Sequence, residues 1–240
     1  GGSQTRLFQV SPGGSLTLTR IKLSGGSAEG GGAIYSEAAT LTLDNCTFDG
    51  NVATNGNGGA VWAEGGNVTI VGGEFLANNA TVYGGALYVV EGILVVQGGS
   101  RLQDNKAEVG GALFCGVEEE ETFKSQAYCS ITDAKFLSNT AARDEQEWVE
   151  DRAERDGGGA AMFQSATVEI TDSEFSWNHA RLSGGAVYGG VDTNVSVNGC
   201  TFGNNTSEFF GGAVSASSLT LGGGTQLTDN SADDDGGAVS

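Results

Sequence analysis

The sequence predicts an all-β protein, a right-handed parallel β-helix (a solenoid) of about eight coils. The first observation is a Gly-Gly-Ala triplet, usually followed by an aliphatic residue, that recurs every 25 to 27 residues apart from one interval of 48. The alanines of the triplets are Ala33, Ala60, Ala86, Ala112, Ala160, Ala186, Ala213 and Ala238. A fixed period of this length is typical of repeats that bury their apolar face only by stacking on one another.

A second motif, an apolar residue followed three positions later by Asn, keeps phase with the triplets. Its copies are Phe48/Asn51, Phe75/Asn78, Leu102/Asn105, Phe136/Asn139, Phe175/Asn178, Phe202/Asn205 and Leu227/Asn230. We expect each Asn to lie in a turn, to tolerate the left-handed backbone conformation there, and to bond through its amide to its copy in the next coil. The glycine pairs mark another corner, where positive φ or close backbone approach is needed.

Short alternating segments precede the second motif and predict the strands. Apolar residues occupy every second position, as in Leu41/Leu43, Val68/Ile70 and Val168/Ile170, with Thr and other polar residues between them. This alternation indicates strands with one buried face. Glycine makes up 41 of the 240 residues and is spread through every repeat, which disfavours helix. A repeat near 26 residues divides naturally into three short strands and three turns.

These paired motifs, for example Gly59-Ala60-Val61 with Phe75 to Asn78, resemble the repeats of the chlamydial polymorphic outer membrane proteins. That family lies within the wider pectin-lyase-like β-helix group, and the similarity runs from about Leu16 to the end of the chain. The resemblance implies a surface-exposed passenger segment with an adhesive or structural role.

The whole chain, 1–240, is expected to be a single β-helix domain. No stretch of 18 apolar residues occurs, so no membrane span is expected in this segment. The last triplet, in Gly236 to Ser240, begins another repeat, and an uncapped solenoid end exposes unpaired strand edges. We therefore expect a segment of a longer solenoid or a filament protomer; the alternative is an arbitrary chain boundary.

Two acidic insertions interrupt one coil, at about 116–128 and 141–156. The first contains Glu118 to Glu121, and the second contains Trp148 and Val149. Insertions in solenoids are where binding functions are often located. Because Trp148 is unfavourable to leave in water, Trp148 and Val149 are candidates for a partner contact; the alternative is a solvated acidic loop.

The four cysteines fall into two pairs. Cys115 and Cys129 flank the first insertion within one coil and are a disulfide candidate, which would indicate an oxidising, extracytoplasmic compartment. Cys46 and Cys200 occupy equivalent positions five coils apart, about 24 Å, which is too far for a disulfide. They are expected to be small buried apolar residues.

Asn-x-Ser/Thr sequons also point outside the cytoplasm. The glycosylation candidates are Asn45, Asn67, Asn79, Asn194 and Asn204; Asn205 belongs to the expected turn ladder and suits a glycan least. Strand alternation places Asn45, Asn67 and Asn194 opposite the buried positions. The alternative is that a Thr- and Asn-rich β-helix produces sequons by accident.

An aromatic stripe follows the aliphatic residue of successive triplets. It contains Tyr35, Trp62, Tyr88, Phe114 and Tyr188, with Met162 between the last two. If the aliphatic residues point inward, alternation turns the stripe outward, where it would suit carbohydrate stacking or side-by-side packing of rods. If the alternation is reversed, the rings fill the core.

The net charge of −19 argues against nucleic-acid partners, and neither a cofactor nor a metal site is expected. Polysaccharide cleavage would need paired carboxylates, and the aspartates at 44, 104, 133, 172 and 229 are not expected to share a position in neighbouring coils. His179 is the sole histidine.

We therefore expect a non-catalytic structural or adhesive solenoid at the cell surface or outside the cell, suited to building a surface filament. Its expected partners are copies of itself, other surface proteins or glycans. The alternative is a carbohydrate-binding or polysaccharide-cleaving β-helix protein.

Overall fold

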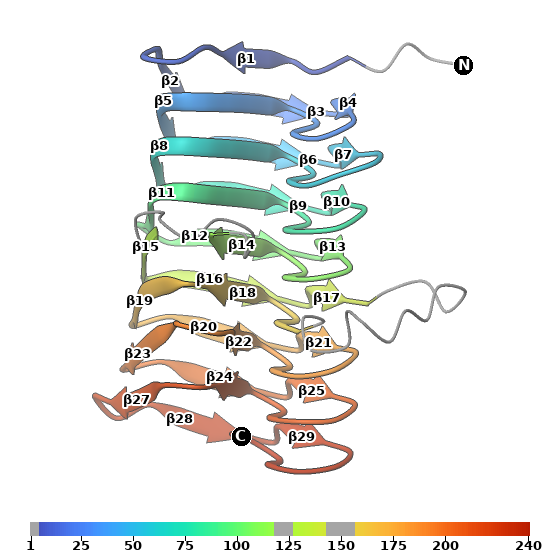
Figure 1. The fold of residues 1–240 in the computed structure, drawn as a ribbon, viewed down its shortest axis with the longest axis vertical. Coiled ribbons are helices and arrows are strands. Elements are labelled where there is room, and N and C mark those ends of the chain that lie inside the picture. The colour runs from blue at the N-terminus through green and yellow to red at the C-terminus, as the bar shows by residue number, and fades with distance from the viewer. Residues whose placement is uncertain (1–4, 118–126, 143–156) are drawn as a thin grey trace.

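The computed structural model describes residues 5–117, 127–142 and 157–240, and these residues form a parallel β-solenoid (Figure 1). Successive strands fall into three sheets, one of 13 strands and two of eight strands each. All of the strand pairs between successive turns are parallel, as in β6 with β9 and β10 with β13. The eight strands in each smaller sheet define eight rungs, numbered here from the N-terminal end.

The strand bounds are as follows. The 13-stranded sheet contains β1 (Phe8–Val10), β2 (Ser15–Thr19), β5 (Ile34–Asp44), β8 (Val61–Val71), β11 (Leu87–Gln97), β14 (Leu113–Gly116), β15 (Ala127–Thr132), β18 (Ala161–Gln164), β19 (Ala166–Thr171), β22 (Val187–Gly189), β23 (Asn194–Asn198), β26 (Val214–Ala216) and β27 (Leu219–Gly222). The second sheet contains β3 (Lys22–Ser24), β6 (Thr47–Asp49), β9 (Glu74–Leu76), β12 (Ser100–Gln103), β16 (Ala134–Leu137), β20 (Glu174–Ser176), β24 (Thr201–Gly203) and β28 (Gln226–Thr228). The third sheet contains β4 (Ser27–Ala28), β7 (Val52–Ala53), β10 (Asn79–Ala80), β13 (Lys106–Ala107), β17 (Thr140–Ala141), β21 (His179–Ala180), β25 (Thr206–Ser207) and β29 (Ser231–Ala232).

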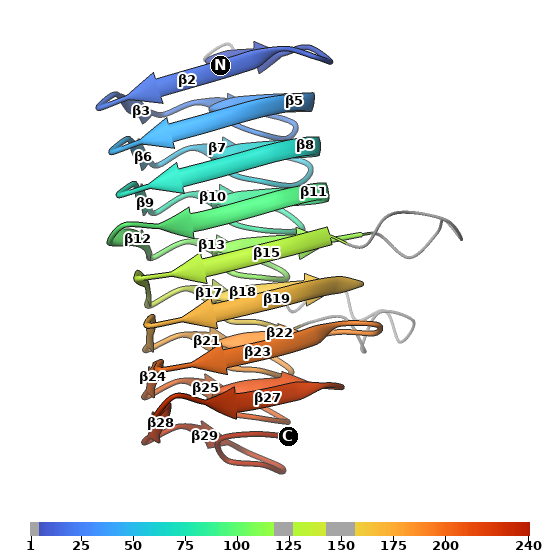
Figure 2. The same ribbon diagram turned by 90° about the vertical axis from the view of Figure 1, so that its left-hand side faces the viewer.

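The coil is right-handed. In Figure 2 the facing strands β2, β5, β8 and β11 run from right to left while the chain descends from the N-terminal end. The all-β, right-handed parallel β-helix predicted from the repeats is therefore confirmed. None of the described residues forms a helix long and apolar enough to cross a lipid bilayer.

The largest sheet bends around one corner of the solenoid. In rungs two to four a single strand of 11 residues passes through the bend, where Ala38 and Glu91 have φ of 43° and 56°. In rung five the first insertion separates β14 from β15 at the same corner. The insertion is narrower than expected, because β14 extends to Gly116 and β15 begins at Ala127. The second insertion likewise begins later than 141, since β17 includes Ala141.

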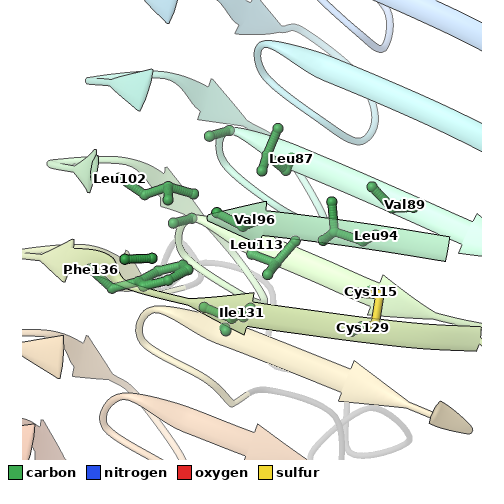
Figure 3. Close-up of a cluster of buried hydrophobic side chains, with 14 of the residues drawn as sticks. Leu87, Val89, Leu94, Val96, Leu102, Leu113, Cys115, Cys129, Ile131 and Phe136 are labelled. Atoms are coloured by element: carbon green, nitrogen blue, oxygen red, sulfur yellow. A yellow bond between two sulfur atoms is a disulfide. The ribbon is translucent and has the colours of Figure 1, made fainter. Parts of the chain in front are cut away.

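The core fills the interior of the coil and is made of the inward residues of each strand (Figure 3). The residues that begin the Asn motif stack on one another, with ring centroids of Phe48 and Phe75 4.7 Å apart and those of Phe175 and Phe202 4.9 Å apart. All of these phenylalanines are fully buried. Burying such a side chain stabilises the fold by about 2 to 3 kcal/mol, so the stack is a large favourable contribution in every rung.

The asparagines of the motif form the expected ladder. The Nδ2 of Asn105 donates to Asn139 Oδ1 at 3.0 Å and to the Phe75 carbonyl at 2.9 Å. The backbone N–H of Asn105 donates to the same Asn139 oxygen at 3.1 Å, and this pattern repeats along the stack. The expected left-handed conformation is wrong for the ladder residues themselves: the residue before each takes it, as at Ala77 with φ of 50°. That residue turns the chain so that the Asn side chain enters the interior.

The two glycines of each triplet have different physical roles. Gly58 has φ of 62°, which an L-residue adopts only with strain. Gly59 has an ordinary φ, but a Cβ there would overlap the Gly85 carbonyl oxygen of the next rung and lie 2.6 Å from the Asn79 carbonyl oxygen. The first glycine is therefore needed for its backbone conformation and the second for close approach of neighbouring rungs.

Candidate interaction surfaces

The aromatic stripe points outward from the main core. Its neighbours along the strands, Ile34, Val61 and Leu87, are fully buried in the central cluster, and alternation turns Tyr35, Trp62 and Tyr88 to the other side. Successive members lie on paired positions of adjacent rungs, and the ring centroids of Trp62 and Tyr88 are 5.4 Å apart. The alternative in which these rings fill the interior is therefore wrong.

The stripe is nevertheless not the exposed binding face that was expected. Tyr88, Phe114 and Met162 are only 2%, 3% and 3% exposed, and Tyr35, Trp62 and Tyr188 are half-buried. Together with Val90 and Val109 the three buried members form a second apolar cluster outside the sheet. An extended sugar could not stack along this row of rings without displacing the residues that cover them.

The cover comes from the turns that precede the glycine pairs. The residues directly before each pair form a short parallel ladder of their own, including Tyr83 with Val109 and Ser183 with Phe210. The Tyr83 ring lies 4.9 Å from the Phe114 ring, and a Cβ on Gly30 would overlap the Trp62 indole. Sequence reasoning missed this layer, although an apolar residue before the glycine pair at Tyr83, Val109 and Phe210 was a signal for it.

Charged side chains surround Tyr35, the N-terminal member of the aromatic stripe. Arg6 lies over the Tyr35 ring at 4.9 Å and donates to the Gly30 and Gly31 carbonyls. Burial and, to a smaller extent, the carboxylates of Glu64 and Glu37 raise the pKa of Tyr35 above its ordinary value. Tyr35 therefore stays a neutral phenol at physiological pH and can donate to Glu64 Oε2 at 3.4 Å.

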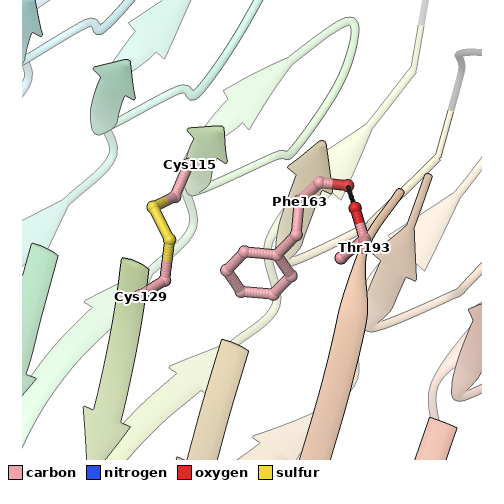
Figure 4. Close-up of a disulfide and its surroundings, with 4 residues drawn as sticks. All are labelled: Cys115, Cys129, Phe163 and Thr193. Atoms are coloured by element: carbon pink, nitrogen blue, oxygen red, sulfur yellow. Dashed lines mark hydrogen bonds between the residues drawn. A yellow bond between two sulfur atoms is a disulfide. The ribbon is translucent and has the colours of Figure 1, made fainter. Parts of the chain in front are cut away.

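Cys115 and Cys129 are joined by a disulfide in rung five, with their Cα atoms 6.7 Å apart (Figure 4). Both side chains face the interior and are fully buried. The ring of Phe163, from the next rung, lies beside the bridge, and Thr193 Oγ1 donates to the Phe163 carbonyl. The disulfide thus joins the strand ends on either side of the first insertion, in the rung where the strand through the bend is interrupted.

Removing this bridge by the paired substitutions Cys115→Ala and Cys129→Ala should lower the free energy of unfolding by about 3 kcal/mol. The reason is that the bridge closes a short loop, with a sequence separation of 14, and so restricts the unfolded chain. Urea unfolding with and without a reductant measures the effect. Reduction should destabilise the wild type by a similar amount and leave the double variant unchanged. Four reactive thiols in the denatured, unreduced protein would contradict the bridge.

The remaining cysteines, Cys46 and Cys200, are both free and buried. Burial raises the pKa of the Cys200 thiol, which disfavours the reactive thiolate. The Cys46 Sγ lies 3.3 Å from the Leu18 carbonyl oxygen, at the narrow corner beside Phe48. Both residues therefore occupy a narrow corner position where a small side chain is required, and Ser100 and Ala134 take the same position in other rungs.

The sequon asparagines lie mostly at the surface. Asn45, Asn67, Asn79 and Asn194 are exposed, and Asn204 is half-buried. Asn45 lies just beyond the end of β5, with φ of 50°, and not on the strand itself. Asn205 is fully buried and its amide donates to the Phe175 carbonyl and to Asn230. None of the five predicted acceptors is buried, whereas Asn205 is part of the ladder.

Trp148 and Val149 lie outside the described residues, as do Glu118 to Glu121. Two of the five aspartates do share a position on adjacent rungs, which corrects the expectation that they share none. Asp133 and Asp172 follow the paired residues Thr132 and Thr171 and occupy equivalent corner positions on adjacent rungs. Both are exposed. His179 lies elsewhere, with its Nδ1 2.9 Å from Thr206 Oγ1.

No group of three or more His, Cys, Asp or Glu side chains that could hold a metal ion occurs within residues 5–117, 127–142 and 157–240. The outward side chains make isolated surface contacts instead. Lys22 pairs with Asp49 at 2.8 Å and Lys135 with Glu174 at 3.4 Å. Tyr128 donates to Glu169 Oε2 at 2.8 Å, and this hydrogen bond raises the pKa of the phenol.

Residues 45–64 match the family model of the Chlamydia polymorphic membrane protein repeat. The matched segment runs from the end of β5 through the ladder residue Asn51 and the Gly58-Gly59 pair into β8. The resemblance suggested by the paired motifs is therefore confirmed over this repeat. No curated protein and no solved structure gave a significant match to the chain.

Proposed function

We propose that this chain is a non-catalytic, surface-exposed solenoid that serves a structural or adhesive role outside the cell. The observation that carries the proposal is the match of residues 45–64 to the membrane-protein repeat, within a rod in which six further rungs contribute an asparagine to the same ladder. The Cys115–Cys129 disulfide supports an oxidising location. A stack of this kind holds a long surface in a fixed shape without needing a ligand or cofactor to fold.

Adhesion is tested directly with beads coated with the folded protein. Coated beads should attach to cultured epithelial cells several-fold more often than beads carrying an unrelated acidic protein of similar size. The net charge is −19, and salt screens attraction between exposed charges. If attachment depends on shape and neutral contacts instead, the coated beads should still attach more often than the control beads at raised salt. Attachment no greater than that of the control beads would contradict an adhesive role.

Catalysis is tested separately with soluble polysaccharides. Incubation with polygalacturonate and with neutral β-glucans should release no new reducing ends or unsaturated products. The Asp133–Asp172 pair is the place where a carboxylate mechanism would act, so both positions are tested by Asp→Asn substitution if products appear. Product release by the wild type that these substitutions abolish would replace the proposal with a polysaccharide-cleaving function.

A further inference from the structure

Trp177 is exposed in a position that does not suit it. It follows β20 in rung six, the residue is 65% exposed, and its φ is 61°. The equivalent residues in the other rungs are small or polar, namely Gly25, Gly50, Ala77, Asp104, Ser138, Asn204 and Asp229. A left-handed conformation costs an L-residue about 1 to 2 kcal/mol, and exposed indole gains nothing from burial. Stability of the coil therefore does not account for tryptophan here.

The two neighbours of Trp177 in its own column are polar and uncharged. Ser138 and Asn204 are its neighbours in the corner column, on the rungs before and after. The adjacent outward column on the third sheet brings Thr140, His179 and Thr206 to consecutive rungs. The nearest charged members of the corner column, Asp104 and Asp229, lie two rungs away, about 10 Å. Hydroxyl, amide and imidazole groups thus flank the indole with both donors and acceptors.

A glycine lies beside Trp177 on the following rung. The backbone N–H of Trp177 donates to the Gly203 carbonyl at 3.0 Å, so Gly203 lies beside it on the following rung. A Cβ placed on Gly203 would have one neighbour within 4 Å, Ser176 Oγ at 3.7 Å. This position therefore carries no side chain of its own, although Gly203 itself is buried.

We propose that Trp177 is the stacking platform of a subsite for a neutral pyranose sugar. The apolar C–H face of a pyranose matches the flat indole, while the ring hydroxyls require neutral donors and acceptors of the kind found at Ser138, Asn204 and Thr206. An acidic polysaccharide would be repelled by the net charge of −19. A protein partner would require a larger apolar patch than a single ring among polar side chains. If the chain is an adhesin, this subsite names the class of its receptor, a neutral sugar. The subsite depends on the proposed adhesive function only for its biological role.

The test uses Trp177→Asn, because Asn tolerates the left-handed conformation and the variant should melt at the same or a higher temperature than the wild type. Binding is measured as retardation in native gels that contain hydroxyethylcellulose, laminarin or galactomannan. We expect at least one of these neutral polysaccharides to retard the wild type and Trp177→Asn to weaken that binding about tenfold. Ala77→Asn, in the same column three rungs away, is the matched control and should bind as the wild type does.

Two results would overturn the subsite: no retardation of the wild type in any of these gels, or equal retardation of the wild type and Trp177→Asn. Sedimentation of both proteins tests whether Trp177 contacts another protein chain instead. The sugar subsite would also be overturned if the wild type forms an oligomer that Trp177→Asn dissociates and no polysaccharide affects either protein. The bead assay distinguishes the two proposals. Wild-type beads that fail to attach contradict the adhesive function, whereas the gels alone decide the sugar subsite.

Discussion

Asn105→Ala is expected to lower the free energy of unfolding by about 3 to 5 kcal/mol. The substitution removes the two bonds that Asn105 Nδ2 donates, to Phe75 and Asn139, and the two that its Oδ1 accepts from Asn78. All four lie in the interior, because Asn78, Asn105 and Asn139 are at most 1% exposed. The Asn78 donors and the Phe75 carbonyl would lose partners where water does not replace them.

Urea unfolding followed by far-ultraviolet circular dichroism measures this loss. Asn194→Ala is the matched control, since Asn194 is exposed on β23 and its removal should change stability by no more than about 0.5 kcal/mol. Equal effects of the two substitutions would contradict the ladder as a source of stability.

Asn105→Asp tests the same ladder through the pH dependence of the free energy of unfolding. The new carboxyl would be buried, and one of its oxygens would face the Phe75 carbonyl and the Asn139 amide oxygen. Burial and these two acceptors disfavour its charged form by more than the two bonds from Asn78 to its other oxygen favour it. Its pKa in the folded state should therefore rise above the unfolded value of about 3.9. A group with a raised folded pKa loses stability as pH rises, so this variant should be most stable below about pH 4 and weaken relative to the wild type toward neutrality. A constant difference across pH would contradict this geometry.

Gly59→Ala is expected to cost about 4 kcal/mol or more, the other large effect in this protein. The added methyl group would overlap the Gly85 carbonyl oxygen and approach the Asn79 carbonyl carbon to 2.7 Å, so backbone on two sides must move. Gly50→Ala separates this effect from backbone strain. Gly50 has φ of 60° with nothing within 4 Å of a Cβ, so its substitution should cost only about 1 kcal/mol.

Soluble yield, urea unfolding and resistance to proteolysis compare the two glycine variants. If Gly59→Ala folds with its rungs locally separated, cleavage by a nonspecific protease should begin near rungs two and three, which meet at Gly59. Equal stability of Gly59→Ala and Gly50→Ala would show that the rungs can separate at little cost, against the close approach described here.

The interior of the solenoid could be predicted from the sequence because its rules are periodic. Each Phe48-type and Asn51-type position has the same neighbours in every rung, so seven copies of one pattern determine the stack. The backbone conformation was assigned one residue too late, because Ala77 and Trp177 carry no sequence preference for a left-handed turn. The left-handed conformation at that corner does not follow from the propensity of the residue that adopts it. It follows from the ladder that the adjacent asparagines form.

The exterior was harder to predict because it depends on turns that bend over the sheet. Alternation placed Tyr88 and Phe114 outside, but it carries no information about Tyr83, which packs against both rings from a turn of irregular length. The Asp133–Asp172 pair was missed for a related reason. An insertion between their rungs shifts the sequence spacing, and only the paired register of β15 and β19 shows that the two residues occupy equivalent positions.

The positions of each rung fall into two groups. Those in the Asn ladder and at the glycine corner contact the neighbouring rungs, whereas the outward positions contact only solvent or a partner. Substitutions in the outward columns, such as the Ser138–Trp177–Asn204 series, change the chemistry of the rod without altering its pitch. The outward residues of such repeats can therefore vary while the same scaffold is preserved. Antibodies raised against one variant would be expected to recognise outward residues and to lose recognition as those residues drift, even though the hidden motifs remain unchanged.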